Sequence, residues 1–152
     1  MDRHIEDLIT ETATSHQLPP TVVRAMVLVE SGGNPNAARY EPDFYKRYIA
    51  GRKLPPAEGK GLAISYGLLQ IMGETARTIG YTGQLAALFA PETGLEWGCR
   101  FLRRLADRYL DDGGWETVCR AYNGGPGNRH NPKSTYPAKV LARIPGGVWP
   151  SA

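Results

Sequence analysis

The sequence predicts a mainly α-helical protein that forms one domain over residues 1–152. Apolar residues recur at helical spacing in several stretches, and glycine or proline clusters separate these stretches. Of the 152 residues, 41% are hydrophobic and 22% are charged, which is the composition of a globular chain and excludes a disordered one. No internal repeat, low-complexity tract or linker divides the sequence.

Two helices are predicted at the N-terminal end. The apolar spacing over residues 5–9 is typical of a first amphipathic helix. Pro20 suits the first turn of a second helix, which should run to about Glu30. This second helix is apolar on nearly every side, so we expect it to be the buried central one. The run SGGNP at residues 31–35 ends it.

A less regular segment is expected over residues 37–64. Its first part is aromatic, and its second part is rich in glycine, proline and lysine. A short helix is predicted around Asp43–Ile49, followed by a small irregular or β excursion around residues 50–66. This segment is the part of the chain for which the sequence pattern gives the least structural detail.

Three further helices are predicted in the C-terminal half. The longest begins at Pro91 and carries one apolar stripe with an arginine-rich opposite face, and Gly113-Gly114 ends it. The next helix has an apolar inner face over residues 115–122 and is broken by NGGPG. A last helix is predicted over Ser134–Ile144.

The cysteines and histidines give no sign of a metal or cofactor site. Cys99 and Cys119 lie on predicted inner faces, where free buried thiols are expected. A disulfide stays open as an alternative if the protein matures in an oxidising compartment. His4, His16 and His130 are scattered and lack the spacing of metal ligands, so no metal and no cofactor is expected.

The charge of the chain is uneven, with a net charge of +3. After Cys119 there are five cations and no carboxylate side chain. Such a basic end suits an anionic partner, either nucleic acid or a cell-wall polymer, or is a cationic rim without a partner. Nucleic acid is disfavoured because the cations lack interleaved aromatic residues and a recognition helix. No membrane span is expected because no apolar run approaches ~18 residues.

Glu30 is the first candidate for chemistry. It lies at the end of the most apolar predicted helix, next to a glycine turn. Burial and the negative end of the helix both disfavour an ionised carboxylate there. A glutamic acid that stays protonated near neutral pH can act as a general acid. The alternative is a glutamate that simply turns into solvent at the helix end.

Two other segments could form a site with Glu30. The segment YGLLQIM at residues 66–72 has one amide, Gln70, among apolar neighbours, and its glycine permits close backbone approach. The segment AYNGGPG at residues 121–127 ends a helix with a phenol and an amide before open glycines. Each segment alone could be core packing and a turn. Together, a carboxylic acid, a phenol and amides suit a site that binds sugar and acts by acid catalysis.

These segments carry a family resemblance. ESGGNPNA (30–37), YGLLQIM (66–72) and AYNGGPG (121–127) resemble, in the same order, the three motifs of the soluble lytic transglycosylases. The resemblance extends over roughly Pro20–Ile144. It implies a goose-lysozyme-like helical domain that cleaves the MurNAc–GlcNAc β-1,4 bond of peptidoglycan glycan strands.

The resemblance also implies a role for each matching residue. Glu30 corresponds to the sole catalytic acid/base, and Tyr122 to a phenol that hydrogen-bonds and orients its carboxyl group. The residues with an implied role in substrate binding are Ser31, Gln70, Met72, Asn123 and, more weakly, Tyr136.

The implied mechanism needs one carboxyl group. Glu30 protonates the glycosidic oxygen, and the N-acetyl group of the muramyl sugar stabilises the charge at the anomeric carbon. Glu30 then accepts the proton of the 6-hydroxyl as that oxygen closes a 1,6-anhydro ring. Most glycosidases use two carboxylates instead. Glu41 and Asp43 are the nearest candidates for a second one, unless they are only surface or local salt-bridge residues.

The sequence departs from the family's pattern between Glu30 and Tyr66, where 35 residues make an unusually long interval. If Glu41 reaches the cleft, hydrolysis by water becomes an alternative, as in a muramidase. A non-catalytic wall-binding or virion structural module is the alternative from another class. The start of the chain has no secretory pattern. We therefore expect an enzyme that acts on the cell wall in the periplasm, delivered by a phage particle or a secretion or lysis system, as a monomer or part of such an assembly.

Overall fold

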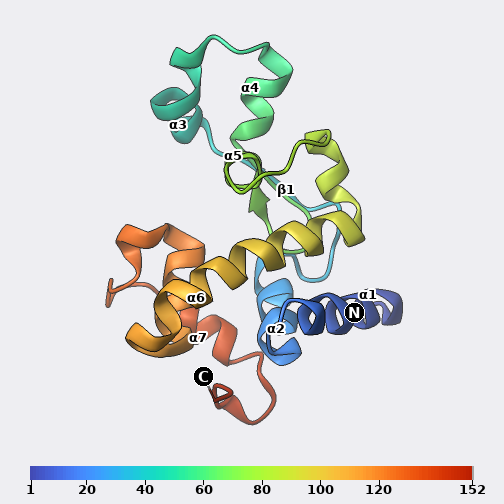
Figure 1. Cartoon of the computed structure of the whole chain (residues 1–152), viewed down its shortest axis with the longest axis vertical. Helices are drawn as coiled ribbons and strands as arrows, with labels where there is room; N and C mark the ends of the chain where they lie inside the picture. Colours follow the sequence, from blue (N-terminus) through green and yellow to red (C-terminus); the bar gives the residue numbers. More distant parts are fainter. Residues whose placement is uncertain (152) are drawn as a thin grey trace.

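The structure, a computed structural model, describes residues 1–151 and is mainly helical, as predicted. Its α-helices are α1 (Arg3–Ser15), α2 (Pro20–Ser31), α3 (Pro42–Phe44), α4 (Pro56–Leu62), α5 (Gly73–Thr78), α6 (Pro91–Gly124) and α7 (Tyr136–Leu141). Figure 1 shows α6 crossing the middle of the molecule, with α3, α4 and α5 on one side of it and α7 on the other.

A small antiparallel sheet lies on the α5 side of α6. Its strands are β1 (Ala38–Tyr40), β2 (Ile64–Tyr66) and β3 (Ile71–Met72), in the order β1-β2-β3. Tyr40 pairs with Ile64, and Ser65 pairs with Met72. Only β2 falls within the excursion predicted around residues 50–66. Strands of two or three residues are too short to produce a readable alternation of apolar and polar positions, so β1 and β3 were missed.

Helix α2 is the central buried helix that the sequence predicts. Val22, Val23, Met26 and Val27 have no exposed surface. The helix ends at Gly32, whose φ of +62° is the left-handed conformation that glycine adopts without strain. The packed helix therefore delivers its last turn, with Glu30, to a fixed place in the molecule.

Helix α6 consists of two helical parts that meet at a kink at Gly113-Gly114, as the sequence predicts. Gly114 has a φ of +73°, outside the helical region. Before the break the helix packs through Leu95, Leu102 and other residues of the predicted stripe, and after it through Trp115 and Val118. The break turns the second part of α6 so that its C-terminal end returns toward α2.

Several helices differ from the prediction. The short helix predicted around Asp43–Ile49 is α3 followed by a π-helix over Tyr45–Ile49, and α5 was not predicted. Helix α4 was expected to be irregular because its sequence, PAEGKGL, has two glycines that weaken a helix. Both glycines are buried, and side chains at Gly59 and Gly61 would meet Tyr45 and Leu85, so close packing stabilises the helix. Helix α7 is shorter than the predicted Ser134–Ile144, because turns replace its outer residues.

The core consists of two hydrophobic clusters. The larger one joins α1, α2, α6 and α7, and the smaller one lies under the sheet around Ile49, Leu62 and Ile71. Phe101 packs against both clusters. Cys99 and Cys119 are free and buried in the larger cluster, as expected, and burial raises the pKa of each thiol to about 12.

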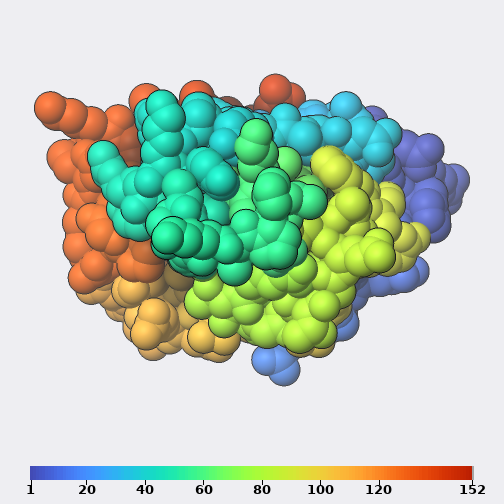
Figure 2. Space-filling model, turned by 90° about the horizontal axis from the view of Figure 1, so that it is seen from above, coloured from blue at the N-terminus to red at the C-terminus, as the bar shows by residue number. Residues whose placement is uncertain are grey.

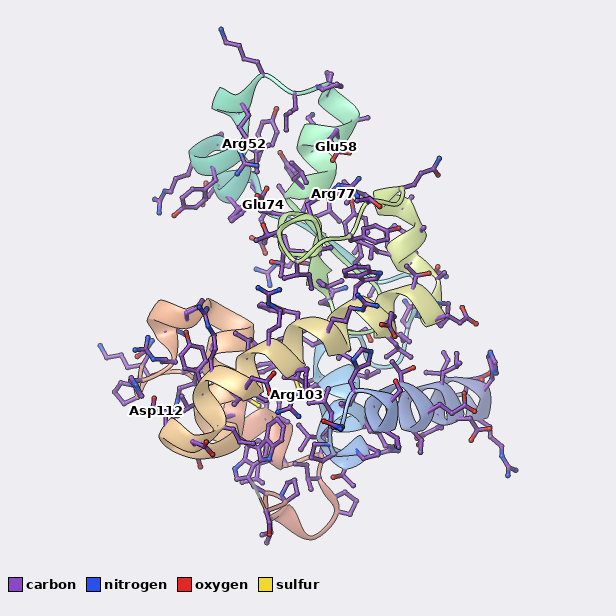
Figure 3. All side chains as sticks on the ribbon, in the orientation of Figure 1. Arg52, Glu58, Glu74, Arg77, Arg103 and Asp112 are labelled. Atoms are coloured by element: carbon purple, nitrogen blue, oxygen red, sulfur yellow. The ribbon has the colours of Figure 1, made fainter. Side chains whose placement is uncertain are left out.

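Two ion pairs join the segment between β1 and β2 to residues of α5. Arg52 contacts Glu74 at 2.8 Å, and Arg77 contacts Glu58 at 3.0 Å (Figure 3). Partly exposed pairs of this kind add ~1 kcal/mol or less each, so they orient the segment more than they stabilise it. Within residues 1–151, no helix is both long and apolar enough to cross a bilayer.

Candidate active site

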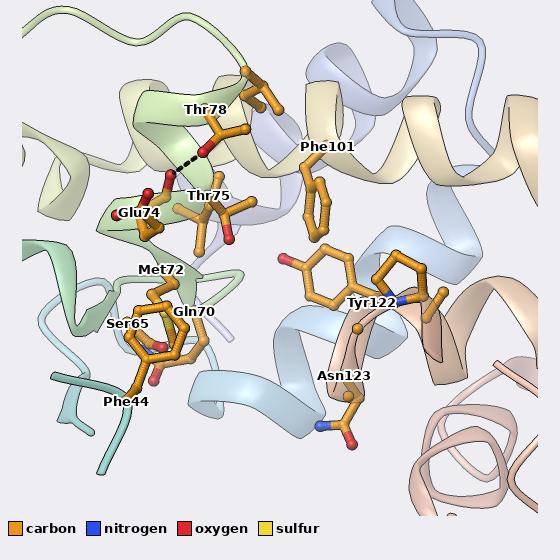
Figure 4. A pocket seen from close by; sticks show the side chains of 16 residues that line it. Phe44, Ser65, Gln70, Met72, Glu74, Thr75, Thr78, Phe101, Tyr122 and Asn123 are labelled. Atoms are coloured by element: carbon orange, nitrogen blue, oxygen red, sulfur yellow. Dashed lines mark hydrogen bonds between the residues drawn. The ribbon is translucent and has the colours of Figure 1, made fainter. Parts of the chain in front are cut away.

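A cleft lies between the sheet side of the molecule and the C-terminal part of α6. It consists of two cavities of about 560 and 360 Å³. The two cavities share the lining residues Ser65, Gln70, Met72, Tyr122 and Asn123. Figure 4 shows Ser65, Gln70 and Met72 on one side of the larger cavity, with Tyr122 and Asn123 on the other. Because they share these walls, the cavities form one continuous cleft.

Glu30 lines the smaller cavity from the last turn of α2. Burial raises the pKa of its carboxyl group to about 7, against an ordinary value of 4.5. A hydrogen bond from Tyr136 and the positive charge of Arg39 partly offset this increase in pKa. The expectation that ionisation is disfavoured at this position is therefore confirmed. Glu30 can hold and release a proton near neutral pH, as a general acid/base requires.

Tyr136 is the phenol that contacts the carboxyl group. It is the first residue of α7, and its hydroxyl donates a hydrogen bond to Oε2 of Glu30 at 2.9 Å. The ring is buried, and burial together with the charge of Glu30 holds the pKa of this phenol well above its ordinary value. Tyr136 therefore stays a hydrogen-bond donor to Glu30 over the pH range in which the glutamate titrates.

The predicted hydrogen bond between Tyr122 and Glu30 was wrong. The Tyr122 hydroxyl donates instead to the backbone carbonyl oxygen of Leu69 at 2.6 Å. Its ring packs on Phe101, with centroids 5.3 Å apart, and this contact directs the hydroxyl toward the turn before β3. Tyr122 still lines both cavities, and its pKa is raised well above the ordinary value by burial and by the nearby charge of Glu30.

Gln70, Met72 and Asn123 all lie in the cleft, as the sequence suggested. Gln70 has a φ of +50°, an uncommon conformation for a residue with a side chain. Its side-chain nitrogen donates to the carbonyl oxygens of Ala37 and Gly67, both at 3.0 Å. These bonds compensate for the strain and fix the amide group in the wall of the cleft.

Ser31 does not line either cavity, and its expected place beside the substrate stays a prediction. Its hydroxyl donates to the carbonyl oxygen of Leu68 at 2.8 Å and accepts from the N–H of Gly33 at 3.2 Å. The hydroxyl is thus engaged by backbone groups of two turns. Ser31 connects the end of α2 to the segment that carries Gln70.

Glu41 reaches the cleft and also forms a local salt bridge. It lines the smaller cavity together with Glu30, and its Oε1 lies 2.9 Å from Nε of Arg39. Both expectations for Glu41 are therefore met at once. Asp43 is exposed and lines neither cavity. Glu41 is therefore the second carboxylate in the smaller cavity beside Glu30, whereas Glu74 lines the larger cavity and pairs with Arg52.

A model of the family described as the transglycosylase SLT domain matches residues 7–141. The chain belongs to this family. Among curated proteins, it resembles the transglycosylase of Enterobacteria phage PRD1, with 28% identity over 140 residues. The match covers 91% of this chain but 42% of the phage protein.

Two solved structures share the fold of this SLT domain. One is an inactive variant of lytic transglycosylase Slt from Pseudomonas aeruginosa, with a TM-score of 0.58 and 18% identity. The other is the 70 kDa soluble lytic transglycosylase of Escherichia coli, with a TM-score of 0.57 and 23% identity. Both matches cover 91% of this chain, which spans 20% and 19% of those two chains.

The SLT motifs meet at the cleft, but they do not supply all of its lining. Arg39, Phe44 and Lys139 line it from outside the three motifs. Sequence reasoning missed them as site residues because exposed cations and aromatic residues also occur on ordinary surfaces. The only available signal was the position of Arg39 and Phe44 in the long interval that departs from the family's pattern.

Proposed function

We propose that residues 1–152 form one catalytic domain of a peptidoglycan lytic transglycosylase. The observation that carries this proposal is the half-buried Glu30, with a pKa of about 7, in a cleft of an SLT-family chain. The proposed reaction is cleavage of the MurNAc–GlcNAc β-1,4 bond in glycan strands. The names of the phage PRD1 relative and of the two bacterial enzymes with this fold support this choice.

In the proposed reaction, Glu30 first acts as an acid. Its proton passes to the glycosidic oxygen, the bond from that oxygen to the anomeric carbon breaks, and Glu30 is left as a carboxylate. The hydrogen bond from Tyr136, 2.9 Å long, stabilises this carboxylate. The acetamido oxygen of the muramyl sugar stabilises the positive charge at the anomeric carbon.

Glu30 then acts as a base. It accepts the proton of the 6-hydroxyl while O6 forms a bond to the anomeric carbon, which closes the 1,6-anhydro ring and restores the carboxylic acid. The nucleophile belongs to the same sugar, so it is already close to the reacting carbon. Such positioning can lower a barrier by ~7–11 kcal/mol, and no base is needed to recruit water.

A muramidase that uses water is the second candidate, because Glu41 lines the same cavity as Glu30. A second carboxylate could position and deprotonate a water molecule. One feature favours the single-acid reaction. Arg39 engages the Glu41 carboxylate at 2.9 Å, so this carboxylate already has a charged partner other than a water molecule.

The products distinguish the two reactions. Purified cell wall is digested with the protein, and the fragments are analysed by mass spectrometry, with Glu30→Gln as the control without the acid. A transglycosylase releases 1,6-anhydromuramic ends, and a muramidase releases reducing ends that are heavier by one water. Predominantly reducing ends would overturn the proposed reaction, and cleavage that persists in Glu30→Gln would overturn the role of Glu30.

The place of action is part of the same proposal. We infer that the domain acts on the periplasmic cell wall and is brought there by a phage particle or by a secretion or lysis system, as a monomer or within an assembly. The phage relative supports this route. Fractionation of infected or expressing cells, with detection of the protein in particles, checks it.

A further inference from the structure

An aromatic surface lies on the long interval between Glu30 and Tyr66. Two of its rings are strongly exposed, since Tyr40 keeps 43% and Tyr48 keeps 53% of its surface in contact with solvent. We call Tyr40, Phe44 and Tyr48 the insert face. Phe44 and Tyr48 pack together, and adjoining exposed rings mark a binding surface more often than single scattered ones do. In Figure 2 the segment around residues 40–55 (teal) spreads over one face of the molecule beside the C-terminal part (orange).

The insert face is held in a fixed place. Ile49, just after these rings, is 1% exposed and belongs to the smaller hydrophobic cluster. The backbone N–H of Glu41 donates to the carbonyl oxygen of Ala63 at 2.9 Å, and Arg52 pairs with Glu74 at 2.8 Å. Rings that are fixed before binding lose little conformational entropy when a ligand covers them.

The insert face continues the wall of the cleft. Phe44 lines the larger cavity together with Met72 and Gln70, and Figure 4 shows its ring beside them. On its outer side, Phe44 packs on Tyr48, with ring centroids 5.0 Å apart. The ring of Tyr40 lies beside that of Tyr45, with ring centroids 6.3 Å apart. A chain molecule that leaves the cleft past Phe44 therefore meets Tyr48 next.

The charge of this segment suits an anionic polymer. Residues 38–53 hold five cations and two carboxylates. Lys46, Arg47 and Lys53 are exposed, whereas Arg39 and Arg52 are paired with carboxylates. Sugar rings present apolar C–H faces that pack on the negative face of an aromatic ring. The stem peptides of peptidoglycan add carboxylates, which the nearby cations attract.

We propose that the insert face is a second binding site for the glycan strand, outside the cleavage site. It holds sugar units that extend beyond the cleft, through contact with Tyr48 and Tyr40 and attraction of stem-peptide carboxylates by Lys46 and Arg47. This proposal rests on the proposed function, because it takes the same strand as its ligand. A membrane surface also binds rings and cations, but the continuity of the rings with the cleft through Phe44 favours the strand.

Binding without turnover tests the proposal. In a Glu30→Gln background, the dissociation constant is measured for long glycan strands and for a short fragment that fills only the cleft. The double variant Tyr40→Ala/Tyr48→Ala should bind long strands about tenfold more weakly, because truncation of buried anchor residues commonly costs this much. The advantage of long strands over the short fragment should shrink by the same factor.

Matched variants serve as controls. Tyr48→Phe keeps the ring and should stay within about twofold of the parent, and Val148→Ala removes an apolar side chain that is 72% exposed elsewhere. Circular dichroism of each variant verifies the fold. Unchanged binding of long strands by the double variant would overturn the proposal, and so would an equal loss for the short fragment.

Two further readouts separate this proposal from others. If the protein binds vesicles of anionic phospholipid and the double variant does not, the insert face is a membrane site and the proposal fails. Cleavage of cell wall is measured separately with the unmodified protein. If the unmodified protein cleaves cell wall but long strands bind equally well to the parent and to the double variant, only the second site is contradicted. If the unmodified protein does not cleave cell wall, yet the double variant binds long strands more weakly, only the proposed reaction is contradicted.

Discussion

The two sides of the cleft are built differently. We call the first side the catalytic wall; α2, α6 and α7 supply its residues, which are Glu30, Tyr122, Asn123 and Tyr136. We call the second side the insert wall; β1, α3 and the turn between them supply its residues, which are Arg39, Glu41 and Phe44. Tyr136 is 5% exposed, whereas the Arg39 side chain is 75% exposed. Burial shifts pKa values on the catalytic wall, and the insert wall stays accessible to a ligand.

In the proposed reaction, this difference separates proton transfer from ligand binding. A group that transfers protons near neutral pH needs a low-dielectric environment, and the larger hydrophobic cluster supplies one for Glu30. A surface that binds a polymer needs exposed rings and charges, which the smaller cluster supports from beneath. Substitutions on the catalytic wall should therefore change the reaction, and those on the insert wall should mainly change binding.

The largest effect is expected for Glu30→Gln. The amide has nearly the same size but cannot donate and then accept the catalytic proton, so cell-wall cleavage should fall by ~10²–10⁴-fold. Turbidity of a cell-wall suspension measures the loss, and thermal unfolding checks the fold. If Glu30→Gln cleared the suspension at a rate near that of the unmodified protein, the catalytic wall would not determine the reaction.

The same substitution should change how stability depends on pH. The pKa of Glu30 is about 7 in the folded state and ordinarily 4.5, so its stabilising effect is complete below pH 4.5 and is lost as pH rises through 7. Relative to the unmodified protein, Glu30→Gln should gain up to about 3 kcal/mol in unfolding free energy between pH 4.5 and 8. Urea unfolding at several pH values measures this gain. A difference that stays constant with pH would mean that Glu30 is not buried in solution.

The two tyrosines of the catalytic wall should respond differently. Tyr136→Phe removes the 2.9 Å hydrogen bond to Glu30, so turnover should fall about tenfold, and the pKa of Glu30 should rise because the bond lowers it. The alkaline limb of the pH profile then moves to higher pH. Tyr122→Phe loses only its bond to Leu69, so it should lower stability by ~1 kcal/mol and leave that limb in place. Equal shifts in both variants would contradict the corrected assignment.

The smallest effect on the reaction is expected for Glu41→Gln. The substitution breaks the 2.9 Å pair with Arg39 but leaves the single-acid reaction intact, so activity should stay within about threefold. Products should still carry anhydro ends, as mass spectrometry can verify. Loss of most activity, with reducing ends in the remaining products, would mean that Glu41 on the insert wall takes part in proton transfer.

The sequence predicted the parts of the site that depend on local pattern. The apolar run of α2 predicted the burial of Glu30, and two motifs predicted the place of Gln70, Met72 and Asn123 in the cleft. Hydrogen-bond partners were harder to predict, because Tyr122 and Tyr136 are both near Glu30 and only three-dimensional packing decides which hydroxyl meets the carboxyl group. The glycine-containing α4 was missed because tertiary packing overrode its low helix propensity.

The hydrogen bond between Tyr136 and Glu30 has a consequence for folding kinetics. It joins residues that are 106 positions apart in the chain, so it requires that α7 has docked on α2. Contacts between distant segments form late, after local helices, because closing a long loop costs conformational entropy. During refolding, helical circular dichroism should therefore recover before the carboxyl group gains its tyrosine partner. Full activity should therefore appear only after α7 has packed in its native position and Tyr136 contacts Glu30.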